Sequence, residues 1–420
     1  MTAPAPERWS DHLVAEILPW WERAVDDEVG GVLTCFDNRG RLVSRDKYTW
    51  SQGRWAWVCA ELAEASGRGD VAADAARWSE RAVRTTSFLV ERSRTADDRT
   101  AFVTDRAGAH RPSGPGGEVS TSVFADLFAV LGIAGGVRAA SGGPDGDDRA
   151  AAWIDTASRM LLVAERSIAD RSALSEPYPV PAGYRDLAGP MTLVHVADQL
   201  GRAGGGAAAA GVRDRALAAL LADGGMLGRT DWSEFRSDAG PGDAMLDAHR
   251  TPGHLLECLW MVVHAQRRAG LEVDVARLAA LASRALEIGW DAEHGGILRY
   301  CDAGGGPPRG ALQTPGRPGR YEQLVLDTWD TKLWWVHAEA MYATALLARA
   351  SGSAELASWH ARVTEYTLAT FPDPEQGEWI QVRARDGQPL DRVVALPVKD
   401  PFHVIRALLL LAADEAPVSA

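Results

Sequence analysis

The chain alternates between apolar runs that predict buried helices and stretches whose apolar residues recur at amphipathic helical spacing. Six of the apolar runs follow a Ser, Thr or Pro residue of the kind that begins a helix. These starts lie at Ser51, Thr121, Pro190, Pro252, Thr331 and Pro401, at intervals of 62 to 79 residues. The spacing predicts six repeats of one structural unit.

Most repeats also predict a second, amphipathic helix, as in "VAADAARWSERAVRTTSFLVER" (71–92) and "VARLAALASRALEIGW" (275–290). Glycine-rich alternating segments, among them "EVGGVLTCFDNRG" and "EHGGILRYCDAGG", predict short hairpins in the connections. Six helix pairs can stack as an open solenoid or close into a ring. The apolar character of one helix in each pair and the absence of polar capping repeats favour closure. We therefore predict an all-α fold, an (α/α)6 barrel with short β-hairpins in the connecting loops, as one domain over residues 1–420.

Composition narrows the classes of partner and compartment. Lys plus Arg number 44 against 57 Asp plus Glu, a formal charge of −13 that argues against nucleic acid as a partner. The cysteines, Cys35, Cys59, Cys258 and Cys301, lie far apart without CxxC pairing, which is typical of a reducing compartment. No signal pattern precedes the first repeat and no uninterrupted apolar run approaches a membrane span. We expect a cytoplasmic protein without membrane contact.

A closed ring brings the starts of its inner helices together at one end. The polar residues expected near this end are Arg54, His195, His254, Lys332 and His403. Unpaired N–H groups and positive helix ends would then face a common cavity, which favours bound anions or developing negative charge. This cavity is the predicted site.

Two histidines, His254 and His403, each follow a proline by two residues at the start of an apolar helix. A helix N-terminus disfavours imidazolium, so His254 is expected to stay neutral and able to act as a base. Glu257 lies three residues after His254 and Arg406 three after His403, on the same helix faces. A histidine that only caps a helix end is the alternative for a single example, but two such histidines favour an acid/base pair across a substrate.

Aromatic residues suggest a sugar as the substrate. The chain has 16 Trp but only 8 Phe and 7 Tyr, and indole faces stack well on the C–H surfaces of sugars. The predicted substrate-binding residues are His195, Lys332, Trp334, Trp335, His337, Glu339, Trp50 and Arg406. Glu339 and Asp330 could also form a glycosidase carboxylate pair, although the sequence does not fix their separation. No HExxH or P-loop motif is present, and no metal or other cofactor is expected.

Several motifs in the same order resemble the N-acylglucosamine 2-epimerase family of sugar epimerases and isomerases. They are "GGVLTCFDNRG", "DKYTWSQGRWAW", "PMTLVHVADQLG", "TPGHLLECLW", "GWDAEHGG", "KLWWVHAEAM" and "FHVIR", between residues 30 and 406. The resemblance implies an (α/α)6 barrel, with His254 and His403 as the acid/base pair, Arg54 at the sugar carbonyl, and Glu257 as a further catalytic residue. His195 is similar to a histidine that some isomerases of the family carry.

The chain departs from the family pattern at a few positions expected near the substrate. Arg250 and Thr251 precede the PGH motif, Asp198 follows the histidine of the third inner helix, and "VALPVKDPFH" replaces a glycine-rich approach to His403. The substrate named for the family is therefore not carried over.

Three functions stay open at this point. The first is a sugar 2-epimerase acting on an N-acylglucosamine/N-acylmannosamine or glucose/mannose type of sugar. The second is an aldose–ketose isomerase of the mannose/fructose type, which differs only in the carbon that receives the second proton. The third is a glycoside-processing or sugar-binding (α/α)6 protein. The expected partners are a small-molecule sugar and, as an open alternative, a second copy of the chain in a homodimer.

Overall fold

The inner helices of the chain form a closed ring. The computed structural model describes residues 8–114, 116–140, 146–391 and 399–415. The inner helices are α3 (Thr49–Arg68), α5 (Val123–Ala140), α7 (Ala188–Arg202), α10 (Pro252–Arg268), α13 (Trp334–Ser351) and α15 (Phe402–Glu415). Each packs on the next in this order, and α15 packs on α3, so the ring closes. The six predicted helix starts lie within three residues of the observed ones.

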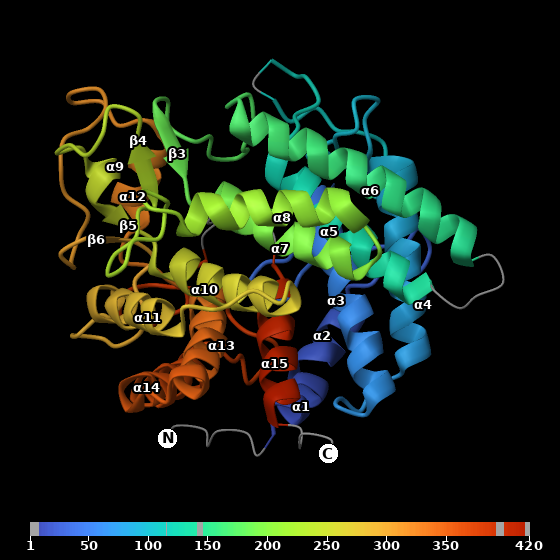
Figure 1. Cartoon of the computed structure of the whole chain (residues 1–420). Helices are drawn as coiled ribbons and strands as arrows, with labels where there is room; N and C mark the ends of the chain where they lie inside the picture. Colours follow the sequence, from blue (N-terminus) through green and yellow to red (C-terminus); the bar gives the residue numbers. More distant parts are fainter. Residues whose placement is uncertain (1–7, 115, 141–145, 392–398, 416–420) are drawn as a thin grey trace.

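A second set of helices surrounds the ring. It consists of α4 (Ala75–Phe88) with its extension η2 (Leu89–Ser93), α6 (Gly146–Ala169), α8 (Gly206–Leu221), α11 (Val275–Gly289) and α14 (Ala354–Thr370). Figure 1 shows α8, α11 and α14 beside α7, α10 and α13, with which they pack. The N-terminal segments α1 (Trp9–His12), η1 (Leu13–Ile17) and α2 (Leu18–Glu22) take the sixth outer position, where α1 and η1 contact α15. The predicted (α/α)6 barrel is confirmed.

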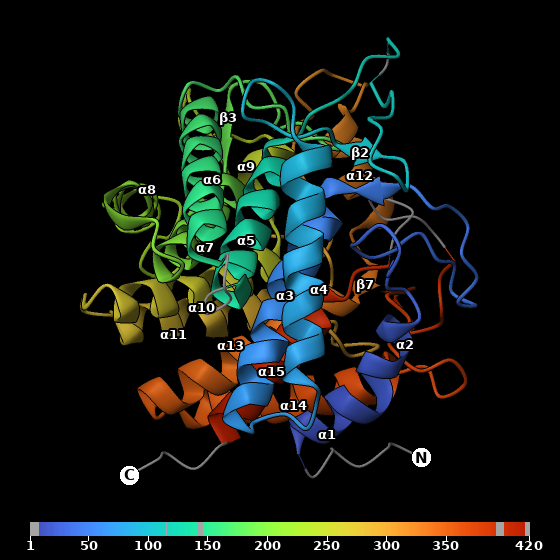
Figure 2. The same ribbon diagram turned by 90° about the vertical axis from the view of Figure 1, so that its right-hand side faces the viewer.

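Short antiparallel strands tie the loops at the N-terminal ends of the inner helices. The pairs are β1 (Lys47–Tyr48) with β2 (Val103–Thr104), β3 (Tyr184–Asp186) with β4 (Phe235–Ser237), β5 (His249–Arg250) with β6 (Cys301–Asp302), and β7 (Lys332–Leu333) with β8 (Val382–Arg383). Each pair joins the loop before an inner helix to the loop after the next outer helix. The same loops carry α9 (Met245–Ala248) and α12 (Arg320–Thr328), and Figure 2 shows β2 and α12 beside the upper end of α4.

A glycine sets the closest helix contact in the ring. A side-chain carbon at Gly53 would lie 2.0 Å from the carbonyl oxygen of Phe128, so α3 and α5 touch through their backbones. This approach places the guanidinium carbon of the next residue, Arg54, 4.0 Å from the Phe128 ring centroid. The packing of α3 on α5 therefore directs Arg54 toward the ring axis.

The inner helices are buried on most sides. One apolar cluster runs through the described helices from Trp9 to Ala412. The single-domain expectation stays a prediction, which this shared core supports. By length and composition α5 could cross a membrane, with a mean hydropathy of 1.7, but 78% of that window is buried inside the structure. Burial of this extent is typical of the core helix of a globular protein.

Candidate active site

One cavity of about 430 Å³ collects side chains from all six inner helices. Its lining includes Trp50, Arg54, Phe124, Phe128, Met191, His195, His254, Glu257, Trp334, Trp335 and His403. This volume is in the range of small-molecule sites. The predicted convergence of the inner helix starts on one cavity is therefore observed.

His254 is held by a buried carboxylate. It is the third residue of α10, and its Nδ1 lies 2.7 Å from Oε1 of Glu234. Because a carboxylate accepts hydrogen bonds, Nδ1 carries the hydrogen and Nε2 keeps a lone pair for the cavity. Burial alone would lower the pKa of His254, but the negative charges of Glu234, Glu257 and Asp186 outweigh it and raise that pKa. The helix-terminus argument predicted a lowered pKa for His254, and the direction is the opposite because the argument omitted Glu234.

His403 has the same type of support from a different helix. Its Nδ1 lies 2.7 Å from Oε1 of Glu339, whose Oε2 accepts from Trp260 Nε1 at 2.7 Å. Arg406 donates to both Glu339 and Glu257 at 2.5 Å. Burial opposes ionisation of Glu339, but Arg406 and His403 outweigh it and lower the pKa of Glu339 to about 2. An ionised Glu339 fixes the Nδ1 hydrogen of His403 and leaves its Nε2 free.

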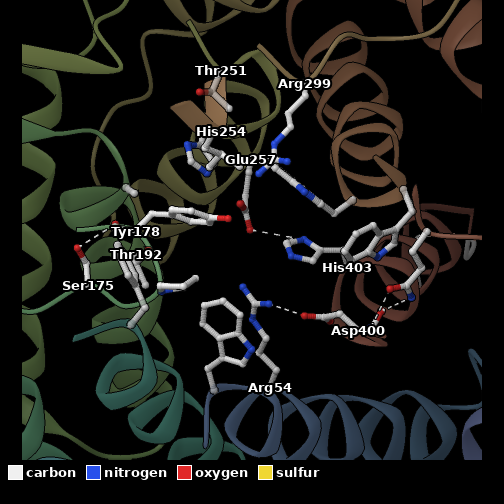
Figure 3. Close-up of a pocket in the computed structure, with 18 of the residues that line it drawn as sticks. Arg54, Ser175, Tyr178, Thr192, Thr251, His254, Glu257, Arg299, Asp400 and His403 are labelled. Carbon is white, nitrogen blue, oxygen red and sulfur yellow. Dashed lines mark hydrogen bonds and ion pairs between the residues drawn. The ribbon is translucent and has the colours of Figure 1, made fainter. Parts of the chain in front are cut away.

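One indole lies close to both imidazoles. The Trp335 ring centroid is 5.4 Å from that of His254 and 5.6 Å from that of His403. Figure 3 shows the histidines on different sides of the cavity, with Glu257 between them in this view. The two imidazoles and the indole thus line one cavity, and the indole offers a flat apolar surface that can carry a sugar.

Arg54 supplies a cation to the same cavity. One guanidinium nitrogen forms an ion pair with Asp400, and the Nε group has no hydrogen-bond partner among the described residues. The rings of Phe128 and Phe402 lie 4.0 and 5.0 Å from the guanidinium carbon. A guanidinium held in this way can stabilise a developing oxyanion.

His195 is a buried imidazole on the cavity wall. The residue is 3% exposed, and its Nε2 has no hydrogen-bond partner among the described residues. Burial, with a smaller contribution from Arg406, lowers the pKa of His195 well below its usual value. A neutral imidazole with an unused nitrogen can bind a sugar hydroxyl.

One cluster beside the cavity has donors that could hold a cation. The ligand atoms of Glu257, Glu339 and His403 lie within 4.8 Å of one another. The Arg406 guanidinium, however, already bonds both carboxylates. The charge of these carboxylates is thus compensated by a side chain of the protein.

The model of the family described as N-acylglucosamine 2-epimerase matches residues 114–407. The chain belongs to this family. The N-acylglucosamine 2-epimerase of Homo sapiens is 28% identical over 96% of this chain and 88% of its own length. A D-mannose isomerase of Pseudomonas cannabina is 28% identical over 42% of this chain and 39% of its own. The cellobiose 2-epimerase structure from Bacillus thermoamylovorans, at 15% identity, matches 97% of this chain and 98% of that one with a TM-score of 0.72.

Membership of this epimerase family identifies the protein as an enzyme of the carbohydrate isomerase class. The structure brings eight of the predicted site residues together in the cavity lining. They are Trp50, Arg54, His195, His254, Glu257, Trp334, Trp335 and His403. Glu339 and Arg406 lie outside the lining and support His403 and Glu257. Their role in substrate binding stays a prediction, and the contacts that the structure shows for them are with His403 and Glu257.

Lys332 was predicted to bind substrate, and the structure places it elsewhere. Its ammonium group is fully buried, 3.3 Å from Asp291, which also accepts from Arg385 at 3.0 Å. The same arrangement recurs before α3, where Lys47 lies 3.0 Å from Asp26. In both repeats the lysine ties the start of an inner helix to the preceding turn, so it is a structural residue.

His337 also lies outside the cavity lining. Its Nδ1 donates to the carbonyl oxygen of Leu333 at 2.8 Å, and its Nε2 accepts from the backbone of Ile297 at 2.9 Å. Both nitrogens are therefore used to hold α13 against a neighbouring loop. Asp330 is likewise absent from the lining, so the alternative glycosidase pair with Glu339 is not assembled.

Of the positions that depart from the family pattern, some line the cavity and others lie outside it. Thr251 lines the cavity, whereas Arg250 pairs with Asp231 at 2.9 Å and Asp198 accepts from Arg268 at 2.8 Å. Neither ion pair lies in the cavity lining. They stabilise the barrel and are not expected to select the substrate.

In the stretch "VALPVKDPFH", residues 394–398 lie outside the described residues. Asp400, within the described part, forms the ion pair with Arg54. Sequence reasoning missed this partner, and it also missed Glu234, Asp186 and Arg299 in the cavity wall. The only available signal for Glu234 was an acidic residue beside a tryptophan in a loop of the same repeat, which is too common to identify it.

Proposed function

We propose that this protein is a 2-epimerase that inverts C2 of a free reducing sugar, using His403 and His254 as the two proton-transfer groups. The observation that supports this most strongly is the matched pair of imidazoles. Each is held at Nδ1 by a carboxylate, lines the same cavity and lies close to Trp335. Inversion of a C–H centre requires a base on one face and an acid on the other.

The reaction starts from the open-chain aldehyde. In one direction, Nε2 of His403 removes the C2 proton and the electron pair moves onto the carbonyl oxygen, giving an enediolate. Arg54 stabilises the negative oxygen. Protonated His254, whose pKa is raised, then delivers a proton to the opposite face of C2. In the reverse direction the two histidines exchange roles.

The remaining residues of the cavity have supporting roles in this proposal. Arg406 bonds both Glu257 and Glu339, and so positions the carboxylate that holds Nδ1 of His403. Trp335 carries the apolar face of the sugar, and His195 binds a hydroxyl through its free nitrogen. The substrate is a reducing sugar of the N-acylhexosamine or glucose/mannose type, and we propose a cytoplasmic enzyme that acts as a homodimer without nucleic-acid or membrane partners.

An aldose–ketose isomerase is the second candidate. The buried, unpartnered Nε2 of His195 favours it, because this imidazole lies in the same cavity and could assist proton delivery at C1. A relative named D-mannose isomerase supports the same alternative. The two activities share the first step and differ only in the carbon that is reprotonated.

One experiment separates these candidates. The protein is incubated in D₂O with N-acetylglucosamine, glucose, mannose, cellobiose, glucuronate and glucose 6-phosphate, and the products are followed by NMR. The 2-epimer with deuterium at C2 is the result expected. A ketose as the main product would show the isomerase, and retention of all C2 hydrogens by a folded protein across this panel would contradict both.

A further inference from the structure

Arg299 is a buried guanidinium in the cavity wall. It lies in the loop between α11 and β6, where its backbone N–H donates to Thr331 at 3.0 Å. The residue is 6% exposed, and its Nη1 has no hydrogen-bond partner among the described residues. No carboxylate in the described part of the chain lies within 4.0 Å of its guanidinium nitrogens. The side chain is therefore buried without a charge partner.

The other cationic groups of the cavity differ from Arg299 in this respect. Arg54 pairs with Asp400, His254 with Glu234, and Lys399 with Glu378. Arg299 lies instead beside an aromatic ring, since its guanidinium carbon is 4.8 Å from the centroid of Tyr300. Burial raises the pKa of Tyr300, so the phenol stays neutral and does not compensate the charge.

A buried guanidinium without a counter-charge costs several kcal/mol. A bound anion removes this cost and gains charge-assisted hydrogen bonds, for which the planar fork of arginine matches carboxylate and phosphate oxygens. The carboxylates nearest to the catalytic groups form no ion pair with Arg299: Glu257 is bonded to Arg406, and Glu234 is bonded to His254 through one oxygen. The counter-charge is thus expected from the ligand.

The position of Arg299 indicates which end of the sugar it meets. Figure 3 shows Arg299 entering the cavity from above and Arg54 from below, with Glu257 and His403 at a level between them in this view. In the proposed mechanism Arg54 binds the carbonyl oxygen at C1. Arg299 then faces the part of the sugar remote from the carbonyl.

We propose that Arg299 selects a reducing sugar that carries an anionic group, a carboxylate or a phosphate, at the end remote from C1. This inference rests on the proposed function, since that function defines which end Arg54 holds. It assigns the substrate class as acidic sugars of hexose size.

The test measures binding without turnover. A His254→Asn, His403→Asn double variant is titrated calorimetrically with glucose, glucuronate and glucose 6-phosphate. Glucuronate or glucose 6-phosphate is expected to bind at least about 10-fold more tightly than glucose, as charge-assisted hydrogen bonds imply. The tighter of the two identifies the anion as carboxylate or phosphate. Adding Arg299→Leu should remove the preference, and Arg299→Lys should keep part of it.

A matched control is Arg309→Leu, which removes an exposed arginine outside the cavity and should leave the preference unchanged. If Arg299→Leu does not fold, the neutral Arg299→Gln replaces it. Equal binding of the three sugars, or an equal loss for all three on removing Arg299, would overturn the inference. Because binding is read in a background without turnover, failure of the proposed epimerase reaction would appear separately, in the D₂O experiment on the unmodified protein.

Discussion

Glu234 accepts the Nδ1 hydrogen of His254 at 2.7 Å, and this contact sets both the orientation and the proton affinity of the imidazole. His403 and Glu339 repeat the arrangement at the same distance. Glu234 lies in the loop before β4, whereas Glu339 lies in helix α13, far away in sequence. The barrel therefore supplies two separately supported imidazoles with their free nitrogens in one cavity.

The first prediction is that Glu234→Gln lowers the pKa of His254, because burial remains while the neighbouring negative charge is lost. In the direction in which His254 donates the proton, the high-pH limb of kcat/KM should move to lower pH. The value at the optimum should fall by about 10²- to 10⁴-fold, since the imidazole also loses its fixed tautomer. The pH–rate profile measures both effects. The exposed Glu80→Gln is the control, and an unmoved limb would remove Glu234 from this role.

The second prediction concerns Arg54. Arg54→Ala should lower kcat by about 100-fold or more, because it removes the cation assigned to the oxyanion. Asp400→Asn keeps the guanidinium and loosens only its ion pair, so its loss should be clearly smaller. Turnover is compared with the melting temperature of each variant. Equal losses in the two variants would show that the ion pair matters and the guanidinium does not.

The third prediction separates a structural lysine from a binding one. Lys332→Met should lower the free energy of unfolding by about 3 kcal/mol, because one partner of a buried ion pair is removed, while KM changes little. Urea titration measures the stability and steady-state kinetics the KM. A large rise in KM without loss of stability would restore Lys332 to the substrate site.

The pH dependence of stability gives a fourth prediction at the same ion pair. Burial opposes ionisation of Asp291, but Arg385 and Lys332 outweigh it and lower its pKa to about 2. A carboxyl group whose pKa is lowered by folding stabilises the folded state at pH values above its ordinary pKa of about 4. This stabilisation is lost as the pH falls from about 4 toward 2. Asp291→Asn should therefore destabilise the protein at pH 7. It should also make the free energy of unfolding depend less on pH between about pH 4 and pH 2. A curve parallel to that of the unmodified protein would contradict the assignment.

The helical pattern allowed the barrel to be predicted, because six apolar runs at regular spacing have few other ways to bury themselves. It also gave His254, His403, Arg54 and Glu257, which lie on the cavity faces of their helices. Periodicity alone could not exclude His337, since it lies three residues after the cavity residue Trp334, about 60° away around the helix.

The partners of these residues could not be predicted in the same way. Glu234 and Asp400 lie in loops, 20 and 346 residues from the side chains they bind. Their positions depend on how the loops fold over the helix ends, which no local pattern encodes. The pKa of His254 was mispredicted for the same reason, because the helix terminus is a local feature and the carboxylate is a tertiary one.

A fifth prediction is that metal removal leaves turnover unchanged. Arg406 already compensates Glu257 and Glu339, so the reaction is expected to need no divalent cation. Dialysis against EDTA followed by assay measures this. Activity lost on dialysis and restored by Mg²⁺, Mn²⁺ or Zn²⁺ would contradict it.

The central claim is that His254 and His403 act on opposite faces of C2, and solvent exchange in single variants tests it most directly. His254→Asn and His403→Asn are each incubated in D₂O with either epimer of the sugar that the unmodified protein interconverts. Net epimerisation should be lost in both. His254→Asn should still exchange the C2 hydrogen of one epimer, and His403→Asn that of the other, because each remaining base reaches one face. Net epimerisation by either variant, or exchange of the same epimer by both, would contradict the two-histidine mechanism.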